Sequence, residues 1–497
     1  MLSKDFYTGL QNDSDYAPAN HQAKNPDPAR KEEVPALVTD VIVIGSGFAG
    51  LAAAIEAAEA GASVMILEKM KAPGGNSRIS DGGIAAPDTS YQAEEGIIDT
   101  PELMYRDMLT AGEGLNHPGL VKIITDQAKE AFLWTRDYLG VKYKNRVDIF
   151  GGHSVPRCYT PESISGSSLI KQQLAHLKRL NLSVHCGARV RSLLQDQSGR
   201  INGVHIIDGY RYKYPFTGVE KNITAVNAVI VATGGFSSDI AYRQAQDPRL
   251  DSSLLTTNQP FATAEMLKEC LRIGANPVQL SRIQLGPWAS PDEKGFGLGP
   301  LFGDYVVLPY GILVNPQTGT RFVNELSDRG SLAEALLKQE QPVIGIADAA
   351  GVEIAGWDLS RALSRGVVKI FDDLQGLAVY YGFKSEALYL TVAGFNAMVQ
   401  NGTDLDFGKN ILKEARPLQR APFYAMRMWP KVHHTMGGIQ IDTSARVIHR
   451  DQYPIPGLFA AGEVTGGVHG SSRLGSCAIT ECLVMGRIAG REAAASL

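Results

Sequence analysis

The chain has 497 residues, of which 44% are hydrophobic and 20% are charged, and its formal net charge is −4. A chain of this length is expected to form two or more domains. The nearly balanced charge gives no reason to expect a nucleic acid or a membrane surface as a partner. The five cysteines form no CxxC or CxxCH pattern, so we expect no disulfide framework, no metal site and no covalently attached haem.

No apolar run approaches the roughly 20 residues that span a bilayer, so no membrane span is expected. Residues 1–36 are polar, contain several prolines and lack the pattern of a signal peptide. We interpret them as a solvated arm or linker, and a tail without function is an equally good interpretation. The missing signal pattern predicts a cytoplasmic protein, or a periplasmic one if a leader has been removed.

Residues 41–44 are a continuous β-branched run, which is typical of a buried parallel strand. A Gly-x-Gly-x-x-Gly turn follows at residues 45–50, and residues 48–60 are Ala-rich and helical. A second strand at 63–67 ends at Glu68, about 20 residues after the turn, where an acid can accept hydrogen bonds from ribose hydroxyls. This βαβ unit predicts a dinucleotide site with its phosphates at the helix N-terminus.

The loops after this unit indicate FAD rather than NAD. Residues 74–77 and 81–84 are two Gly-rich turns, placed where a loop would wrap the ring end of a long cofactor. Glu463 offers a further acid for ribityl or ribose hydroxyls. The chain has no second Gly-x-Gly-x-x-Gly unit, so the simplest interpretation is one non-covalently bound FAD and no separate NAD domain.

Three later segments complete the same fold. Residues 222–232 read as a strand that ends in a Thr-Gly-Gly turn, residues 457–462 read as another strand, and residues 476–494 read as a final helix. We therefore predict an α/β fold, in which a Rossmann-like FAD-binding domain is assembled from both ends of the chain.

The domain boundaries follow from this assembly. The FAD-binding domain is expected to comprise residues 37–285 and 433–497, and the inserted α+β capping domain residues 286–432. Within the insertion we expect strands at 305–308 and 312–315, and helices at 331–338 and 385–401.

Residues 432–438 and 468–475 crowd His, Arg and Gly together, and neither stretch has the periodicity of a helix or a strand. Such a composition is typical of loops that hold an anion beside a cofactor. Together with the dinucleotide turn, these stretches indicate a flavin enzyme that acts on a small carboxylate.

These patterns together resemble the flavoprotein family of soluble fumarate reductases, which includes the succinate dehydrogenase flavoprotein and the urocanate reductases. The resemblance implies a mobile capping domain that closes over the flavin. It also implies reduction of an activated alkene, with hydride passing from flavin N5 to the β-carbon. The matching stretches are residues 40–50, 74–84, 232–235, 321–325, 433–438 and 457–490.

The residue chemistry and the resemblance together suggest catalytic roles. Arg473 offers a bidentate fork for a carboxylate, and His433 can add a donor, as the matching family positions do. The resemblance assigns proton donation to Arg329, which the sequence alone would place on the surface at a helix start. An arginine serves as an acid only where a neighbouring acid reprotonates it and water is excluded.

The expected cofactor contacts come from the turns described above, from the Gly-rich stretches that contain His434 and His469, and from the start of the final helix. The N-terminus of that helix would stabilise an anionic reduced flavin. The expected contacts are Gly45, Gly47, Ala49, Gly50, Glu68, Lys69, Gly75, Asn76, Ser77, Gly82, Gly83, Thr233, Gly234, His434, Glu463, His469, Ser476, Ala478 and Ile479.

The sequence departs from the family where fumarate reductases hold the second carboxylate with a His and a Thr-Glu pair. By alignment, Gly286 takes the place of the His and Gly303-Asp304 that of the pair, which makes fumarate a poor substrate. Asp304 could accept a hydrogen bond from an imidazole, as in urocanate reductases, or pass a proton to Arg329. Trp288 and Tyr305 could stack on a flat group.

We therefore expect an FAD-dependent reductase of a urocanate-like, aryl or alkyl 2-enoate. It would receive electrons from a separate donor protein, a cytochrome or a flavin reductase, because no haem motif, FMN-attachment motif or NAD domain is present. Alternatives are a fumarate reductase proper, a dehydrogenase that works in the oxidative direction, and a flavin electron carrier without enzymatic activity.

Overall fold

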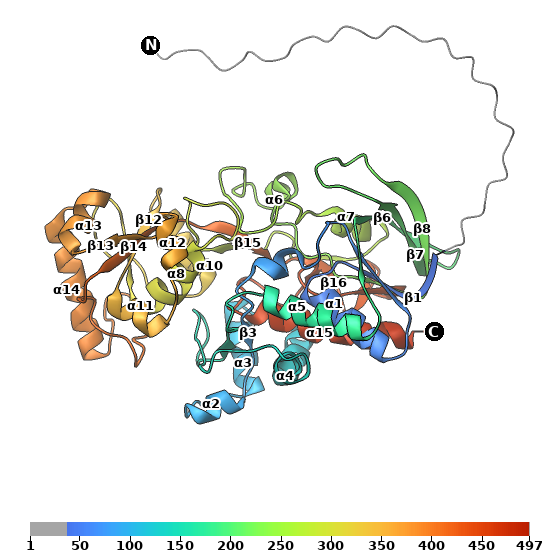
Figure 1. Ribbon diagram of the computed structural model, residues 1–497, viewed down its shortest axis with the longest axis horizontal. Helices are drawn as coiled ribbons and strands as arrows, with labels where there is room; N and C mark the ends of the chain where they lie inside the picture. The colour runs from blue at the N-terminus through green and yellow to red at the C-terminus, as the bar shows by residue number, and fades with distance from the viewer. Residues whose placement is uncertain (1–36, 497) are drawn as a thin grey trace, which may run out of the picture. The chain divides into compact units, whose positions relative to one another are not determined.

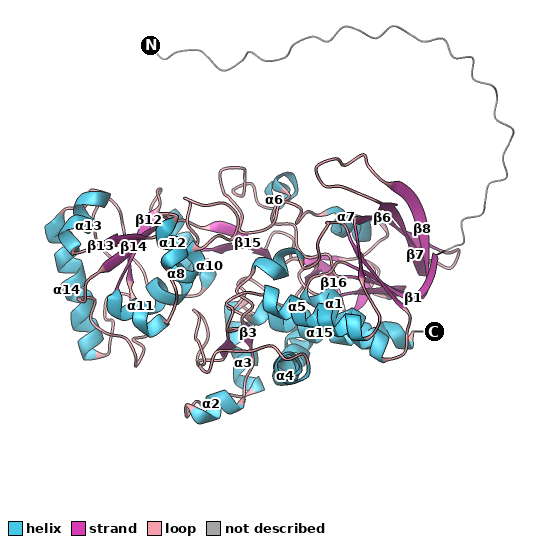
Figure 2. Ribbon diagram, in the orientation of Figure 1, coloured by secondary structure: helices cyan, strands magenta, loops and turns pink. Residues whose placement is uncertain are grey.

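The computed structural model of the protein describes residues 37–496, so the expected arm at 1–36 lies outside the described residues. Within that range, no helix combines the length and the apolar character needed to cross a membrane. Figure 1 follows the chain from the N-terminal blue to the C-terminal red, and Figure 2 distinguishes helices, strands and loops.

The largest sheet has eight strands, five of which are parallel neighbours. Its β1 contains the predicted β-branched run, and Val41–Ile44 are at most 4% exposed because helices and strands cover them on all sides. The strands, in order across the sheet, are β17 (Arg446–Ile448), β18 (Pro454–Ala460), β8 (Val219–Val231), β1 (Leu37–Ile44), β2 (Val64–Glu68) and β5 (Val184–Cys186), with β7 (Ile201–Asp208) beside β8 and β6 (Ala188–Gln195) beside β7.

Two helices from opposite ends of the chain pack against each other below this sheet in Figure 1: α1 (Phe48–Glu59) and α15 (Cys477–Ala495). Gly486 and Gly490 allow the close contact. A Cβ atom at Gly486 would lie 2.5 Å from the carbonyl oxygen of Ala49, and one at Gly490 would lie 2.2 Å from that of Ala53. The predicted assembly of the Rossmann-like domain from both chain ends is thus confirmed.

A second, antiparallel sheet has four strands and its own apolar core. It lies within the predicted insertion, together with α13 (Leu374–Tyr381) and α14 (Ser385–Asn401), which Figure 1 draws in orange. The strands, in order, are β11 (Ile312–Val314), β12 (Val343–Asp348), β14 (Phe423–Met428) and β13 (Lys369–Phe371).

The two connections between these sheets pair with each other. Strand β10 (Ile283–Gly286) enters the insertion, β15 (Lys431–Thr435) leaves it, and the two are antiparallel partners. The proposed boundaries at 286 and 432 therefore fall in one two-stranded ribbon.

Two sequence predictions are wrong in this region. Residues 305–308 are not a strand, because the chain forms a π-helical turn at η3 (Gly303–Val307) and continues into α9 (Leu308–Tyr310). A run of buried apolar residues has the same pattern in either structure. The stretch at 432–438 does not begin as a loop, because Val432–Thr435 belong to strand β15. The composition of this stretch did not reveal that β15 pairs with β10.

The remaining elements connect these parts. They are η1 (Gly75–Ile79), β3 (Ile84–Ala85), α2 (Ser90–Glu94), α3 (Pro101–Ala111), α4 (Pro118–Leu133), η2 (Trp134–Tyr138), β4 (Cys158–Tyr159), α5 (Ser167–Arg179), α6 (Ile240–Gln246), α7 (Glu265–Arg272), β9 (Pro277–Val278), α8 (Gly299–Phe302), α10 (Arg329–Leu337), α11 (Ala349–Ala355), α12 (Ser360–Ser364), β16 (Gly438–Gln440) and β19 (Thr465–Gly466).

A buried ion cluster fixes the loop that leads into α10. Glu325, fully buried, pairs with Arg321 at 2.7 Å and with Lys409 at 3.5 Å, and it also accepts the backbone N–H of Leu313 at 3.1 Å. Asp404 accepts from the same Arg321 nitrogen, Nη2, at 2.9 Å. Burial lowers the pKa of Lys409 to about 8. The cluster thus ties residues 321–325, which precede α10, to Asp404 and Lys409.

We predict that Glu325→Gln lowers the free energy of unfolding by about 3 kcal/mol, because two buried cations would lose a shared counter-charge. Denaturant unfolding would measure the change. The control is Glu353→Gln, which removes the exposed partner of Arg420 and should cost below about 1 kcal/mol. Equal effects of the two substitutions would contradict the structural role of Glu325.

Candidate active site

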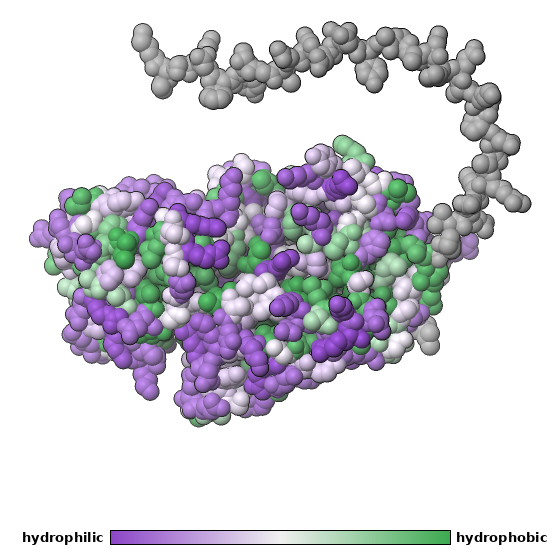
Figure 3. Space-filling model, in the orientation of Figure 1, coloured by the Kyte–Doolittle hydropathy of each residue, from purple (hydrophilic) through white to green (hydrophobic). Residues whose placement is uncertain are grey.

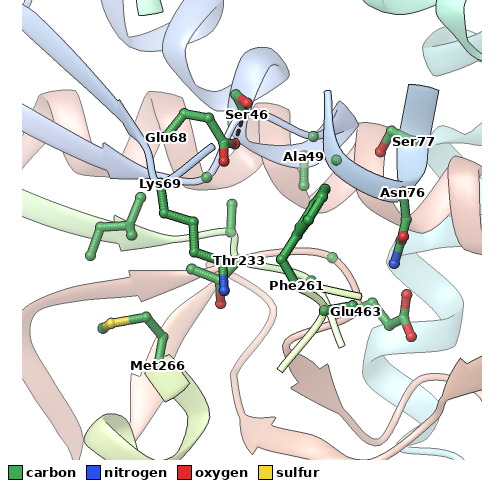
Figure 4. Close-up of a pocket in the computed structure, with 18 of the residues that line it drawn as sticks. Ser46, Ala49, Glu68, Lys69, Asn76, Ser77, Thr233, Phe261, Met266 and Glu463 are labelled. Atoms are coloured by element: carbon green, nitrogen blue, oxygen red, sulfur yellow. Dashed lines mark hydrogen bonds between the residues drawn. The ribbon is translucent and has the colours of Figure 1, made fainter. Parts of the chain in front are cut away.

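A first cavity of about 970 Å³, counting the space open to solvent, lies at the carboxyl ends of β1, β2 and β8. Ser46 donates to one Glu68 carboxylate oxygen at 2.5 Å, and the backbone N–H of Met70 donates to the other at 2.8 Å. Figure 4 shows Glu68, Lys69, Thr233 and Glu463 around this space. The two bonds orient the carboxylate and leave lone pairs for ribose hydroxyls.

The turn between β1 and α1 fits a pyrophosphate. Gly47 is the N-cap of α1 and has no side chain to cap the helix, and the Phe48 N–H donates to the Ser77 hydroxyl at 3.1 Å. An anion would therefore bind the N–H groups that follow Phe48 in the first turn. Gly45 has a φ of 103°, and a Cβ atom there would lie 2.3 Å from the carbonyl oxygen of Ala232. A Cβ atom at Gly50 would lie 2.1 Å from the carbonyl oxygen of Gly45. The turn tolerates only glycine at both positions.

A second cavity of about 900 Å³, again counting open space, adjoins the first. The two share lining residues from α1, η1, α15 and the loop after β18, namely Phe48, Asn76, Ser77, Cys482 and Glu463. A continuous site of this length fits a dinucleotide in the first cavity with its ring system in the second. The four residues predicted to be catalytic, Asp304, Arg329, His433 and Arg473, all line the second cavity.

Two guanidinium groups are buried in the second cavity. Arg329, at the first position of α10, donates to Asp304 of η3 at 2.9 Å, and both residues are 8% exposed. Arg473 is 5% exposed and bonds the carbonyl oxygen of Leu474 at 3.0 Å, while its Nε has no partner among the described residues. Burial lowers the pKa of Arg473 to about 10. An unsatisfied buried guanidinium is suited to bind an anion.

The two adjacent histidines are neutral, because burial and then the positive charge of Arg473 hold both their pKa values well below the usual range. His433 Nδ1 bonds the Thr257 hydroxyl at 2.8 Å, and Asn258 donates to the His433 carbonyl oxygen at 2.8 Å. The loop at 257–258 therefore fixes the orientation of His433 in the cavity.

Trp288 occupies the space next to His433. Its ring meets the His433 ring edge-on, with centroids 4.8 Å apart, and the Arg329 guanidinium lies 5.5 Å from its centre. A Cβ atom at Gly286 would lie 3.1 Å from this ring, and one at Gly303 would lie 2.5 Å from the Trp288 backbone oxygen. Side chains at Gly286 and Gly303 would thus both press against one tryptophan.

The rings of His434 and His469 meet edge to face, with ring centroids 5.5 Å apart. His469 bonds Glu481 of α15 at 2.8 Å, and His434 lies 3.5 Å from Glu463. His434, His469 and Glu481 could also hold a cation, since one ligand atom from each lies within 4.8 Å of the others. The direct His469–Glu481 bond already satisfies two of these groups.

Three of the expected cofactor contacts, Gly50, Gly82 and His469, line neither cavity. Gly50 packs against Gly45, and His469 packs against His434, which do line a cavity. The first cavity is lined by Gly45, Gly47, Ala49, Glu68, Lys69, Gly75, Thr233 and Gly234. The second cavity is lined by Gly83, His434, Ser476, Ala478 and Ile479, and both cavities by Asn76, Ser77 and Glu463.

Sequence reasoning missed several lining residues. Asp81 lies in the Gly-rich turn at 81–84, but the sequence assigned it no contact. Cys482 lies four residues after Ala478 on the same face of α15, so helical periodicity could have indicated it. Thr257, Asn258 and Phe296 had no signal, since they belong to loops without a motif.

The arrangement defines a flavoprotein, and comparison with known proteins agrees. The FAD binding domain family model matches residues 40–479. The chain is 41% identical to the acrylate reductase flavoprotein subunit of Shewanella woodyi, covering 91% of this chain and 90% of that protein. It is 34% identical to the urocanate reductase of Eggerthella lenta, covering 92% and 74%.

Among solved structures, the open conformation of a flavocytochrome c3 fumarate reductase matches with a TM-score of 0.73 and 31% identity, covering 93% of this chain and 79% of that one. The chain belongs to the FAD binding domain family. Within that family it is an FAD-dependent oxidoreductase that acts on the C=C bonds of enoates. The resemblance to fumarate and urocanate reductases and the choice of FAD are confirmed.

We predict a pH-dependent contribution of Asp304 to stability. Burial raises its pKa to about 6, against the opposing effect of Arg329. A raised pKa means that the contribution is full below the unfolded value of 3.8 and is lost as pH rises through about 6. The unfolding free energy of wild type relative to Asp304→Asn should therefore fall by about 3 kcal/mol between about pH 4 and about pH 7.

Asp208→Asn is the control of opposite sign, because hydrogen bonds from Lys221 and His185 lower the Asp208 pKa. Its wild-type advantage should grow as pH rises from below 3.8. A pH-independent difference for Asp304→Asn would show that Asp304 does not titrate in this range.

Proposed function

We propose that the protein reduces the C=C bond of a 2-enoate that carries one carboxylate, acrylate or an alkyl- or aryl-substituted acrylate, in preference to fumarate. The observation that carries the proposal is the Trp288 side chain, which fills the space where a second carboxylate would need polar partners. The similarity to an acrylate reductase flavoprotein subunit supports the same substrate class.

Arg473 and His433 are proposed to hold the single carboxylate. The Nε of Arg473 has no partner among the described residues and is enclosed by protein. The neutral imidazole of His433 can accept from Thr257 at Nδ1, which places its proton on Nε2 as a donor to the substrate. These donors stabilise the negative charge that develops on the carboxylate during reduction.

The wall beside His433 offers a second carboxylate few donors. It is formed by Trp288 and Phe296, with ring centroids 5.5 Å apart. The buried indole N–H of Trp288 has no partner among the described residues, and Gly286 and Gly303 contribute no side-chain donors. An ionised group against this wall would exchange its hydration for a single neutral donor. A vinyl group, an alkyl chain or a flat ring would instead gain apolar and stacking contacts.

Arg329 is proposed to give a proton to the α-carbon, and Asp304 to restore it. Bound FAD supplies the hydride that is added at the β-carbon. The ion pair at 2.9 Å places an acid directly behind Arg329, and exclusion of water limits other proton exchange. Because Asp304 is engaged with Arg329, it is less suited to read an imidazole ring, which disfavours urocanate.

Electrons are proposed to come from a separate donor protein, a cytochrome or a flavin reductase. The family model covers residues 40–479 with a single FAD binding domain. The match to a protein named as a flavoprotein subunit supports this division of labour.

We predict the following order of substrates in anaerobic assays with a dithionite-reduced viologen dye. Acrylate, methacrylate or cinnamate should reoxidise the dye rapidly, while fumarate should be slower by about 10-fold or more, because one charge-assisted contact is lost. Urocanate tests the alternative in which Asp304 reads an imidazole. Faster turnover of fumarate than of any monocarboxylate would refute the role given to Trp288.

We also predict that Arg329→Lys keeps FAD absorbance but lowers kcat by about 100-fold or more, since a lysine cannot keep the planar contact to Asp304 while reaching the α-carbon. Arg427→Lys is the matched control, because Arg427 makes an exposed ion pair with Asp292 outside the cavity. Normal turnover by Arg329→Lys would remove Arg329 from the mechanism.

A further inference from the structure

A large cavity lies on the far side of Asp304 from the substrate. It measures about 1520 Å³, counting the space open to solvent, and it is lined by residues 146–150, by Pro309 and Tyr310, and by residues 410–414. Asp304 and Tyr305 of η3 line both this outer cavity and the substrate cavity. The π-helical turn thus forms a wall between solvent and the active site, with one carboxyl group in it.

Figure 3 shows a notch at the lower edge of the molecule, bordered by hydrophilic residues. It lies between the part of the chain that carries α11 and the part that carries α2, as Figure 1 shows. The outer cavity is lined from the same parts, by Ile354 of α11 and by Glu95, which directly follows α2.

Other groups near Asp304 are less suited as proton sources. Asp81 lines the substrate cavity with Asp304 and does not line the outer cavity, and it accepts from the Tyr305 hydroxyl at 2.8 Å. Val307, on the same turn, is fully buried and apolar, and its methyl groups pack against Gly345. A smaller cavity connects Asp304 and Arg329 to Glu325, but Glu325 is already engaged by Arg321, Lys409 and a backbone N–H. Those charges lower the pKa of Glu325 and keep it ionised, so it is a poor carrier.

We propose that the outer cavity is the proton inlet of this enzyme and that Asp148 is the carboxyl group which relays protons through water to Asp304. This inference rests on the proposed roles of Arg329 and Asp304. In each turnover Arg329 gives one proton to the α-carbon and takes one from Asp304. Asp304 then regains a proton from the inlet, so one proton enters from solvent for each hydride that is transferred.

Asp148 has the position and surroundings that this relay needs. Its side chain is 15% exposed, it pairs with Arg146 at 2.9 Å, and it accepts from the Thr160 hydroxyl at 2.9 Å. Burial raises its pKa, which favours the protonated form. Besides Asp304, the other titratable groups that line the cavity are Glu95, Arg146, Tyr305, Tyr310, Lys413 and Glu414, of which Glu95, Lys413 and Glu414 are exposed.

The test uses the FAD-loaded full-length enzyme with reduced viologen dye and acrylate. Asp148→Asn should lower kcat by roughly 10-fold to 100-fold and leave KM unchanged, because Asp148 does not line the substrate cavity. The solvent deuterium isotope effect on kcat should increase. Added formate, a small acid that the outer cavity can admit, should restore turnover, and Asp148→Glu should retain it.

Asp208→Asn is the control, since Asp208 is also a partly buried, paired carboxylate but lines none of these cavities. Leu412→Trp is a second variant that narrows the cavity without removing a charge, and it should slow turnover without rescue by formate. Full turnover of Asp148→Asn or of Leu412→Trp would overturn the proposal that protons enter through the outer cavity. A loss of turnover in Asp148→Asn that formate does not restore would overturn it as well.

The two proposals fail in different ways. Normal turnover of Asp148→Asn, with an inactive Arg329→Lys variant, would overturn the inlet alone. Normal turnover of Arg329→Lys would overturn the proposed proton donor, on which the inlet depends.

Discussion

The buried pair of guanidinium groups, Arg329 and Arg473, is the constraint on which the rest of the active site depends. Removing a charged group from water costs several kcal/mol unless a partner compensates it. Asp304 compensates Arg329 at 2.9 Å, while Arg473 has a backbone carbonyl and an unpartnered Nε. Burial, and then the positive charge of Arg473, keep His433 and His434 neutral. The unpartnered Nε of Arg473 is a donor that a substrate carboxylate could accept.

The proposed substrate preference depends on the packing of one side chain. Trp288 is 2% exposed; its backbone excludes a side chain at Gly303, and its ring lies 3.1 Å from a Cβ atom at Gly286. This aromatic group lies beside His433 and supports the proposed preference for a monocarboxylate over a dicarboxylate.

Much of the fold could be predicted because its signals are local. The β-branched run at 41–44, the glycines at 45–50 and Glu68 fall within one βαβ unit, and their backbone requirements are visible in the order of the residues. The same holds for α14 and α15, whose predicted and observed limits agree within one or two residues. Residues 305–308 failed because a buried apolar run is equally compatible with a strand and with a helical turn.

The sequence by itself determined the cofactor, through the dinucleotide turn, and the class of chemistry, through the resemblance to the fumarate and urocanate reductases. Only the tertiary structure decided which groups meet. Asp304 is 25 residues before Arg329, and Thr257 is 176 residues before His433, yet each pair is in hydrogen-bond contact. Trp288 fills the space beside two glycines, and the outer cavity reaches Asp304 from solvent. These features depend on packing between distant segments, which residue order does not encode locally.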